Sequence, residues 1–169
     1  MRKALYFLGI LTDSDIDWLV AAGARREIAS GTNLIERGRP INSVYVVIDG
    51  AFEVQGDDSE RLMSGEVMGE MLLVDRDLPA ETIQAVEPSF VLEIPRRRLR
   101  AKLAEDAGFS ARYYRAVARF QIARQLAADA QQAEGPADDS EGEMDFDALD
   151  NVSMAGARFD WIQKRLRSG

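Results

Sequence analysis

The sequence contains neither cysteine nor histidine among its 169 residues. Without cysteine there are no disulfides, no thiolate nucleophiles and no thiolate metal ligands. Without histidine, imidazole cannot act as a general acid or base, and histidine-based triads and the usual zinc sites are excluded as well. These two absences exclude most familiar small hydrolases and metalloenzymes, so we expect neither a metal site nor catalytic residues.

Long apolar runs are also missing. No stretch reaches the roughly 18 apolar residues that a membrane-spanning helix requires. The chain opens with Arg2, Lys3 and a short apolar stretch, but Asp13 follows too early for a secretory signal. We therefore expect a soluble, cytoplasmic protein without a transmembrane segment.

The negative charge is concentrated in one segment. Residues 131–150 hold eight acidic residues and no Lys or Arg, and removing these eight from the 29 acidic residues leaves 21, equal to the number of basic residues. A polar, acidic composition of this kind is typical of a flexible linker, and it disfavours binding of DNA. The sequence thus predicts three regions, a folded domain over 1–130, an acidic flexible linker over 131–150 and an amphipathic terminal element over 151–169.

The predicted domain begins with a helix and continues with strands. Thr12 and the acidic residues after it have the pattern of a capping box, and Gly23 is placed to end the helix. From 25 to 94, short β-branched runs alternate with glycines, and the turn Asp49–Gly50 after the strongest run signals a hairpin. Many short strands of this kind predict a small β-sandwich, jelly roll or barrel.

The pattern becomes helical again after Pro95. One helix is predicted at Arg96–Glu105 and a longer one at 110–130, where we expect Ser110 to be the N-cap. The first of these contains a basic run, because positions 96–98 and 100 are all arginine. That run fits either an acidic partner, including the acidic segment of the same molecule, or a solvated helix face.

The predicted long helix has two apolar faces. Tyr113, Val117 and Phe120 lie on one, and Tyr114 and Ile122 lie on the other. A surface helix usually needs only one apolar stripe, so two stripes indicate packing on its own domain and also on a partner. We expect these five residues to mediate a homodimer. The alternative is a helix that the same chain buries on both sides.

Residues 151–167 predict a terminal amphipathic helix. An isolated helix of this length is marginal in water, so we expect it to dock. The parent domain, a second subunit, the groove of another protein and an anionic membrane surface are all compatible docking sites. The residues expected to mediate this interaction are Val152, Ala155, Phe159, Trp161, Ile162 and Leu166.

Several stretches together resemble the cyclic-nucleotide-binding domain family. Residues 43–50 (SVYVVIDG) are similar to a strand and turn of that family, and residues 62–71 (LMSGEVMGEM) resemble the glycine-rich approach to its phosphate-binding cassette. The resemblance covers roughly 5–128. It implies an α+β fold, in which a β-roll of the jelly-roll type is flanked by an N-terminal helix and by C-terminal helices.

The resemblance also implies a ligand site, with cAMP or cGMP as the candidate ligand. Gly69 lets the backbone approach a ligand, a short helical turn follows it, and Glu70 matches the glutamate that accepts a hydrogen bond from the ribose. The family's phosphate-pairing arginine is replaced by Pro79, which leaves Arg76 as the nearest substitute. The candidate ligand-binding residues are Gly69, Glu70, Met71, Leu72, Arg76, Ala80, Glu81 and Thr82.

The end of the chain bears on function. Transcription regulators of this family carry a helix-turn-helix domain after the long helix, but only about 40 residues follow it here and half are in the acidic segment, so we expect no DNA binding. Glu66 and Glu70 are weak evidence for acid/base catalysis. We expect a non-enzymatic regulatory or sensor module that acts as a homodimer through its C-terminal helices. The alternative is a protein-interaction scaffold with a degenerate pocket that works through the terminal helix.

Overall fold

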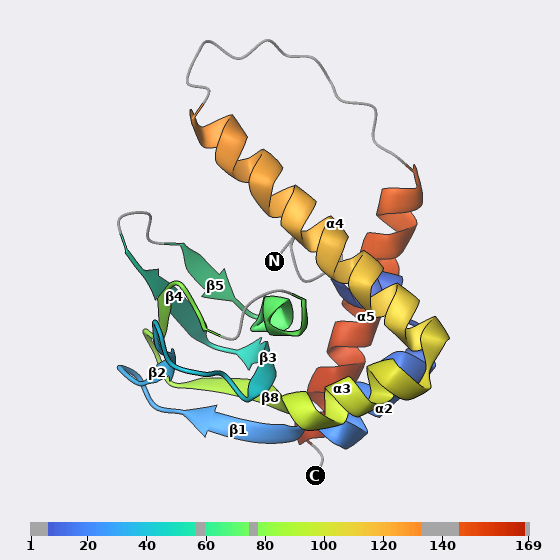
Figure 1. Cartoon of the computed structure of the whole chain (residues 1–169), viewed down its shortest axis with the longest axis horizontal. Coiled ribbons are helices and arrows are strands. Elements are labelled where there is room, and N and C mark those ends of the chain that lie inside the picture. The colour runs from blue at the N-terminus through green and yellow to red at the C-terminus, as the bar shows by residue number, and fades with distance from the viewer. Residues whose placement is uncertain (1–6, 57–59, 75–77, 133–145, 168–169) are drawn as a thin grey trace.

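The computed structural model describes residues 7–56, 60–74, 78–132 and 146–167. A β-roll lies on one side of the molecule, and the helices gather on the other (Figure 1). The elements are, in order, α2 (Asp13–Ala22), β1 (Ala24–Ile28), β2 (Asn33–Ile35), β3 (Ser43–Asp49), β4 (Ala51–Gln55), β5 (Arg61–Met63), β6 (Val67–Met68), the 3-10 turn η1 (Glu70–Leu73), β7 (Thr82–Ala85), β8 (Ser89–Pro95), α3 (Arg96–Glu105), α4 (Ala107–Gln132) and α5 (Phe146–Arg167).

The strands form two four-stranded antiparallel sheets. Their orders are β1-β8-β3-β6 and β2-β7-β4-β5. The non-sequential order, with β8 between β1 and β3, is that of a jelly roll. The predicted fold, an α+β β-roll flanked by helices, is therefore confirmed.

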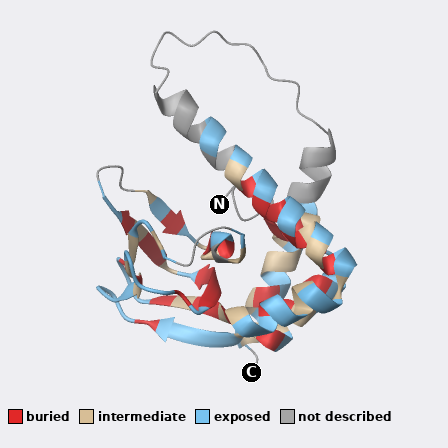
Figure 2. Ribbon diagram, in the orientation of Figure 1, coloured by how far each residue is buried: buried red, intermediate tan, exposed pale blue. Residues whose placement is uncertain are grey.

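Strand β3 explains how the two layers hold together. Its residues are buried along almost the whole strand. Val44, Val46 and Ile48 belong to the core shared with the helices, whereas Tyr45 and Val47 belong to the core between the two sheets. Successive side chains of a strand point to opposite faces, so a strand covered on both faces needs the continuous apolar run seen in the sequence. Buried positions accordingly lie along the strands of the roll as well as on the helices (Figure 2).

Two predicted local signals are confirmed. The Thr12 hydroxyl accepts a hydrogen bond from the Asp15 N–H at 3.3 Å, and the Asp15 carboxylate accepts one from the Thr12 N–H at 2.8 Å, which completes the capping box. Gly50 joins β3 to β4 with a φ of 91°, and a Cβ there would overlap the Ser89 side chain. Glycine is therefore required at this turn for both conformation and space.

Two predicted helix starts are wrong. Helix α4 begins at Ala107 rather than Ser110, because the Asp106 carboxylate caps it by accepting a hydrogen bond from the Phe109 N–H at 2.8 Å. Helix α5 begins at Phe146, inside the stretch expected to be linker. Acidic residues near a helix N-terminus are stabilised by the helix dipole, so Asp147 and Asp150 are compatible with helix as well as with linker composition.

Helix α5 docks on its own domain, which resolves the alternatives that the sequence left open. Ala155 and Ile162 are fully buried in the core shared by α2, β3 and α4. The Arg158 guanidinium donates to the carbonyls of Leu8 and Gly9 at 2.9 and 3.1 Å. Helix α5 is therefore an integral layer of the fold that ties down the N-terminal segment.

A buried ion pair joins α2 to α4. The Arg112 guanidinium contacts both carboxylate oxygens of Asp15, at 2.6 and 2.9 Å, and the Asp15 side chain is only 4% exposed. Burial alone would raise the pKa of Asp15, but hydrogen bonds from Arg112 and Thr12 outweigh it and hold the pKa below its usual value. Among the helices of the described ranges, none is long and apolar enough to cross a membrane.

Candidate ligand pocket

The candidate site is built on the turn after β6. Gly69 adopts the left-handed conformation with a φ of 82°, and the 3-10 turn η1 follows it directly. This is the short helical turn expected after the glycine. Because Gly69 has no side chain, the chain can reverse here and bring Glu70 inward beneath α4.

A cavity of about 290 Å³ lies beside this turn. Its volume is near the lower end of the range for small-molecule pockets. The described residues that line it are Ile35, Ile41, Val54, Glu60, Leu62, Glu66, Val67, Met68, Gly69, Glu70, Met71, Leu78, Pro79, Ala80, Glu81, Ile83 and Phe120. Both sheets, η1 and α4 thus contribute to one pocket.

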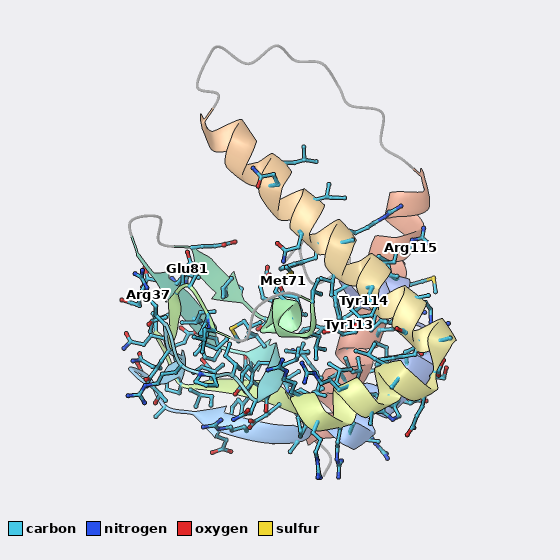
Figure 3. All side chains as sticks on the ribbon, viewed as in Figure 1. Arg37, Met71, Glu81, Tyr113, Tyr114 and Arg115 are labelled. Atoms are coloured by element: carbon cyan, nitrogen blue, oxygen red, sulfur yellow. The ribbon has the colours of Figure 1, made fainter. Side chains whose placement is uncertain are left out.

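The structure brings five predicted ligand-binding residues to this cavity, namely Gly69, Glu70, Met71, Ala80 and Glu81. Figure 3 shows Met71 at the turn, with Glu81 on the same side of the β-roll as Arg37. The Thr82 side chain lies elsewhere, since its hydroxyl accepts a hydrogen bond from the Arg37 N–H at 3.1 Å. The Leu72 side chain and all of Arg76 lie outside the described residues.

Glu70 makes the most informative contact of the site. It is 5% exposed, and its carboxylate accepts a hydrogen bond from the Gln121 side chain of α4 at 3.0 Å. The Tyr113 hydroxyl lies 3.5 Å from the Glu70 carbonyl oxygen, and burial raises the pKa of this tyrosine, which keeps it protonated as a donor. The pocket turn is thus joined to α4 through both the carboxylate and the backbone carbonyl of Glu70.

Sequence reasoning missed Gln121. The signal was present, because Gln121 follows Val117 by four residues and therefore lies on the same inner face of the helix. A polar side chain on that face needs a partner inside the protein. The glutamate of the turn is that partner.

The described residues that line the cavity differ from those of a typical anion-binding site. The polar side chains among the described lining residues are four glutamates, and neither Lys nor Arg is among them. Pro79 occupies the position expected for a phosphate-pairing arginine, and its carbonyl accepts a hydrogen bond from the Gly38 N–H at 2.9 Å. Carboxylates close to a bound phosphate oppose its binding unless cations offset them.

The residues predicted to form a dimer are divided between two faces of α4. Tyr113, Val117 and Phe120 are buried in the domain, whereas Tyr114 and Ile122 are 41% and 60% exposed. Leu126, one turn after Ile122, is 63% exposed and extends this outer face. The inner apolar face therefore packs on the same chain, and only the outer face remains open.

The predicted residues of the terminal helix are divided in the same way. Ala155 and Ile162 are buried, and Phe159 and Leu166 pack against the same core. Trp161 remains 40% exposed. The side chain of Val152 lies outside the described residues.

The basic run at the start of α3 faces solvent. Arg97, Arg98 and Arg100 are exposed, whereas Leu99 between them is fully buried. The Arg98 guanidinium also donates to the Ala22 carbonyl at 3.1 Å, at the end of α2. This placement is that of a solvated helix face.

Residues 25–106 match the family model of the cyclic nucleotide-binding domain. A candidate potassium channel protein of Rhodopseudomonas palustris is 28% identical over 133 residues, which cover 76% of this chain. The match spans only 32% of that relative's length.

Solved structures show the same fold. A cyclic nucleotide-binding domain of Methylobacillus flagellatus has a TM-score of 0.67 at 15% identity, covering 80% of this chain and 84% of that one. The sensor domain of the transcriptional regulator DNR of Pseudomonas aeruginosa has a TM-score of 0.54 at 16% identity, covering 78% and 90%. A structure from a study of a cyclic-GMP-dependent signalling pathway has a TM-score of 0.56 at 25% identity, covering 69% and 95%.

Proposed function

We propose that this chain is a non-enzymatic, cytoplasmic regulatory sensor in which helix α4 responds to occupancy of the pocket. The observation that carries the proposal is the 3.0 Å hydrogen bond between the Gln121 side chain and the Glu70 carboxylate. A ligand that donates hydrogen bonds to the Glu70 carboxylate competes with Gln121, so occupancy of the pocket changes how α4 is held. Phe120 lines the same cavity and places α4 against the ligand.

The output surface in this proposal is the outer face of α4. Tyr114, Ile122 and Leu126 are exposed there in a row at helical spacing. Apolar side chains exposed in such a row are typical of a helix that pairs with another helix. We infer a homodimer through this face, which ligand-induced movement of α4 would tighten or loosen. DNA is not a partner in this proposal.

The first ligands to test are cAMP and cGMP, because the domain family and a neighbour from a cyclic-GMP-dependent pathway suggest them. Isothermal titration with each nucleotide should give measurable heat for the unaltered chain and a large loss of affinity in Glu70→Gln. The matched control is Glu27→Gln, which removes the same charge from exposed strand β1. Equal binding in both variants would refute a ligand role for Glu70.

The second candidate function is a scaffold that binds no cyclic nucleotide. The replacement of the arginine by Pro79 and the glutamate lining favour it. Absence of heat with both nucleotides, from a protein shown to be folded by circular dichroism, would select this alternative. The exposed side of α5 would then be its interaction surface.

A further inference from the structure

The start of α3, the start of β1 and the end of α5 lie at one end of the molecule (Figure 1), and exposed arginines gather there. The Arg98 guanidinium donates to the carbonyl of Ala22, which ends α2 just before β1 begins. The Arg25 guanidinium of β1 donates to the Leu166 carbonyl at 3.3 Å, near the end of α5. The exposed cations at this end, here termed the basic pole, are Arg25, Arg97, Arg98, Arg100, Arg165 and Arg167.

The basic pole has little negative charge to balance it. Glu27 lies 3.8 Å from Arg25, and it lines a hollow of about 450 Å³ together with Arg25 and Arg165. Arg97 and Arg100 make no ion pair with any residue that the structure describes. The chain outside 131–150 has equal numbers of acidic and basic residues, so the excess at the pole is a local concentration of positive charge.

The arginines at the start of α3 are unfavourable for the helix itself. Positions 96–98 are all arginine, the first turn contains no acidic residue, and Pro95 at the N-cap makes no side-chain hydrogen bond. The N-terminal end of a helix dipole is positive, so cations there are destabilising, whereas Arg165 and Arg167 suit the negative end of α5. Folding alone therefore does not account for Arg97. An external anion would be attracted both by its guanidinium and by the helix dipole.

The acidic segment of the sequence is attached at the other end of the molecule. Helix α4 ends at Gln132 and α5 begins at Phe146, and both of these points lie at the end opposite the basic pole (Figure 1). The sequence between them contains six acidic residues and no basic residue. The basic pole can therefore approach an extended anionic surface while both attachment points of this segment face away from it.

We propose that the basic pole binds the surface of an anionic phospholipid membrane. The planar guanidinium group donates two hydrogen bonds to a phosphate, which suits arginines to lipid headgroups. A cluster of about four to eight basic residues is of the size that holds a protein on anionic lipid. An acidic protein segment would contact only part of the pole, whereas a membrane surface meets all of it. This surface goes beyond the proposed function, because it gives the sensor a place to bind that is separate from its pocket.

Vesicle sedimentation tests the proposal with the full chain. The unaltered protein should bind vesicles of one part phosphatidylglycerol to two parts phosphatidylcholine, and it should not bind vesicles of phosphatidylcholine alone. The attraction is electrostatic, so binding should be lost as the salt concentration rises from about 0.1 M to about 1 M, which shortens the screening length from about 10 Å to about 3 Å. Absence of binding to the anionic vesicles, equal binding to both kinds, or binding that survives the higher salt would contradict the proposal.

Removal of two charges identifies the surface. Each arginine near an anionic membrane contributes about fivefold to affinity, so Arg97→Gln combined with Arg100→Gln should weaken vesicle binding about 25-fold. The matched control combines Arg37→Gln with Arg39→Gln, which removes the same charge from exposed positions after β2. Arg37 lies on the side of the β-roll away from α3 (Figure 3), so the control should lose no more than about twofold. An equal loss in both double variants would overturn the proposal.

The helix dipole gives a second readout that needs no vesicles. Arg97→Glu places an anion in the first turn of α3, so the melting temperature should rise while binding to the anionic vesicles falls further than in Arg97→Gln. A lower melting temperature would show that Arg97 stabilises the fold, which would contradict its assignment to a partner. Binding of double-stranded DNA or of polyglutamate that depends on Arg97 and Arg100, without binding of vesicles, would assign the pole to a different anion and overturn the proposal.

Discussion

The docking of α5 on the core makes a quantitative prediction for Ile162→Ala. The Ile162 side chain is 1% exposed and packs in the core between the helices and β3. Truncating a fully buried isoleucine to alanine removes its burial and leaves a cavity, which costs about 2–5 kcal/mol. In a chain of this size, a loss of about 3 kcal/mol corresponds to a fall in melting temperature of about 6–12 °C.

The assay is urea unfolding followed by circular dichroism, with Ile122→Ala as the matched control. Ile122 is 60% exposed on another helix, so the same truncation there should change the free energy of unfolding by about 0.5 kcal/mol or less. Measurement at two protein concentrations separates folding from self-association. If Ile162→Ala costs no more than Ile122→Ala, α5 does not pack on the core and the described architecture is wrong at that helix.

Two further predictions concern the fold. Arg112→Ala leaves the Asp15 carboxylate buried without its cation, which should lower the free energy of unfolding by about 3 kcal/mol. This value is at the lower end for a broken buried pair, because Arg112 is partly exposed. Urea unfolding measures the loss. The pKa of Asp15 is lowered in the folded state, so its contribution is present above the ordinary value of 3.8 and is lost as the pH falls through the folded pKa. Below about pH 4, the free energy of unfolding should therefore fall more steeply with falling pH in the unaltered chain than in Asp15→Asn. Equal slopes in the two proteins would contradict the assignment. Gly50→Ala forces a side chain into a left-handed turn and into Ser89, so its melting temperature should fall clearly below that of Gly56→Ala, where a Cβ meets nothing within 4 Å.

The parts of the fold that the sequence predicted are those with strong local signals. The capping box at Thr12, the apolar run of β3 and the Asp49–Gly50 turn each specify their structure within a few residues. The start of α4 was missed because Asp106 and Ser110 both suit an N-cap, and only packing of the first turn decides between them. The start of α5 was missed because acidic residues fit both a linker and a helix N-terminus.

The candidate site was predictable only as a set of positions. The glycine turn and the loss of the arginine are visible in the sequence, since both are single-residue features of a recognisable pattern. The contact between Glu70 and Gln121 joins residues 51 positions apart and depends on how α4 crosses the roll. The division of α4 and α5 into one buried and one open face likewise needs the tertiary arrangement, because both faces of each helix contain apolar residues.

The central claim is that the pocket turn and α4 are coupled through Gln121. Hydrogen exchange measured by mass spectrometry tests it without any ligand, in Gln121→Ala and in the control Arg119→Ala, which changes an exposed position of the same helix. The account predicts faster exchange in residues 69–74 of Gln121→Ala, and no change there in Arg119→Ala. Unchanged exchange of residues 69–74 in Gln121→Ala would contradict it.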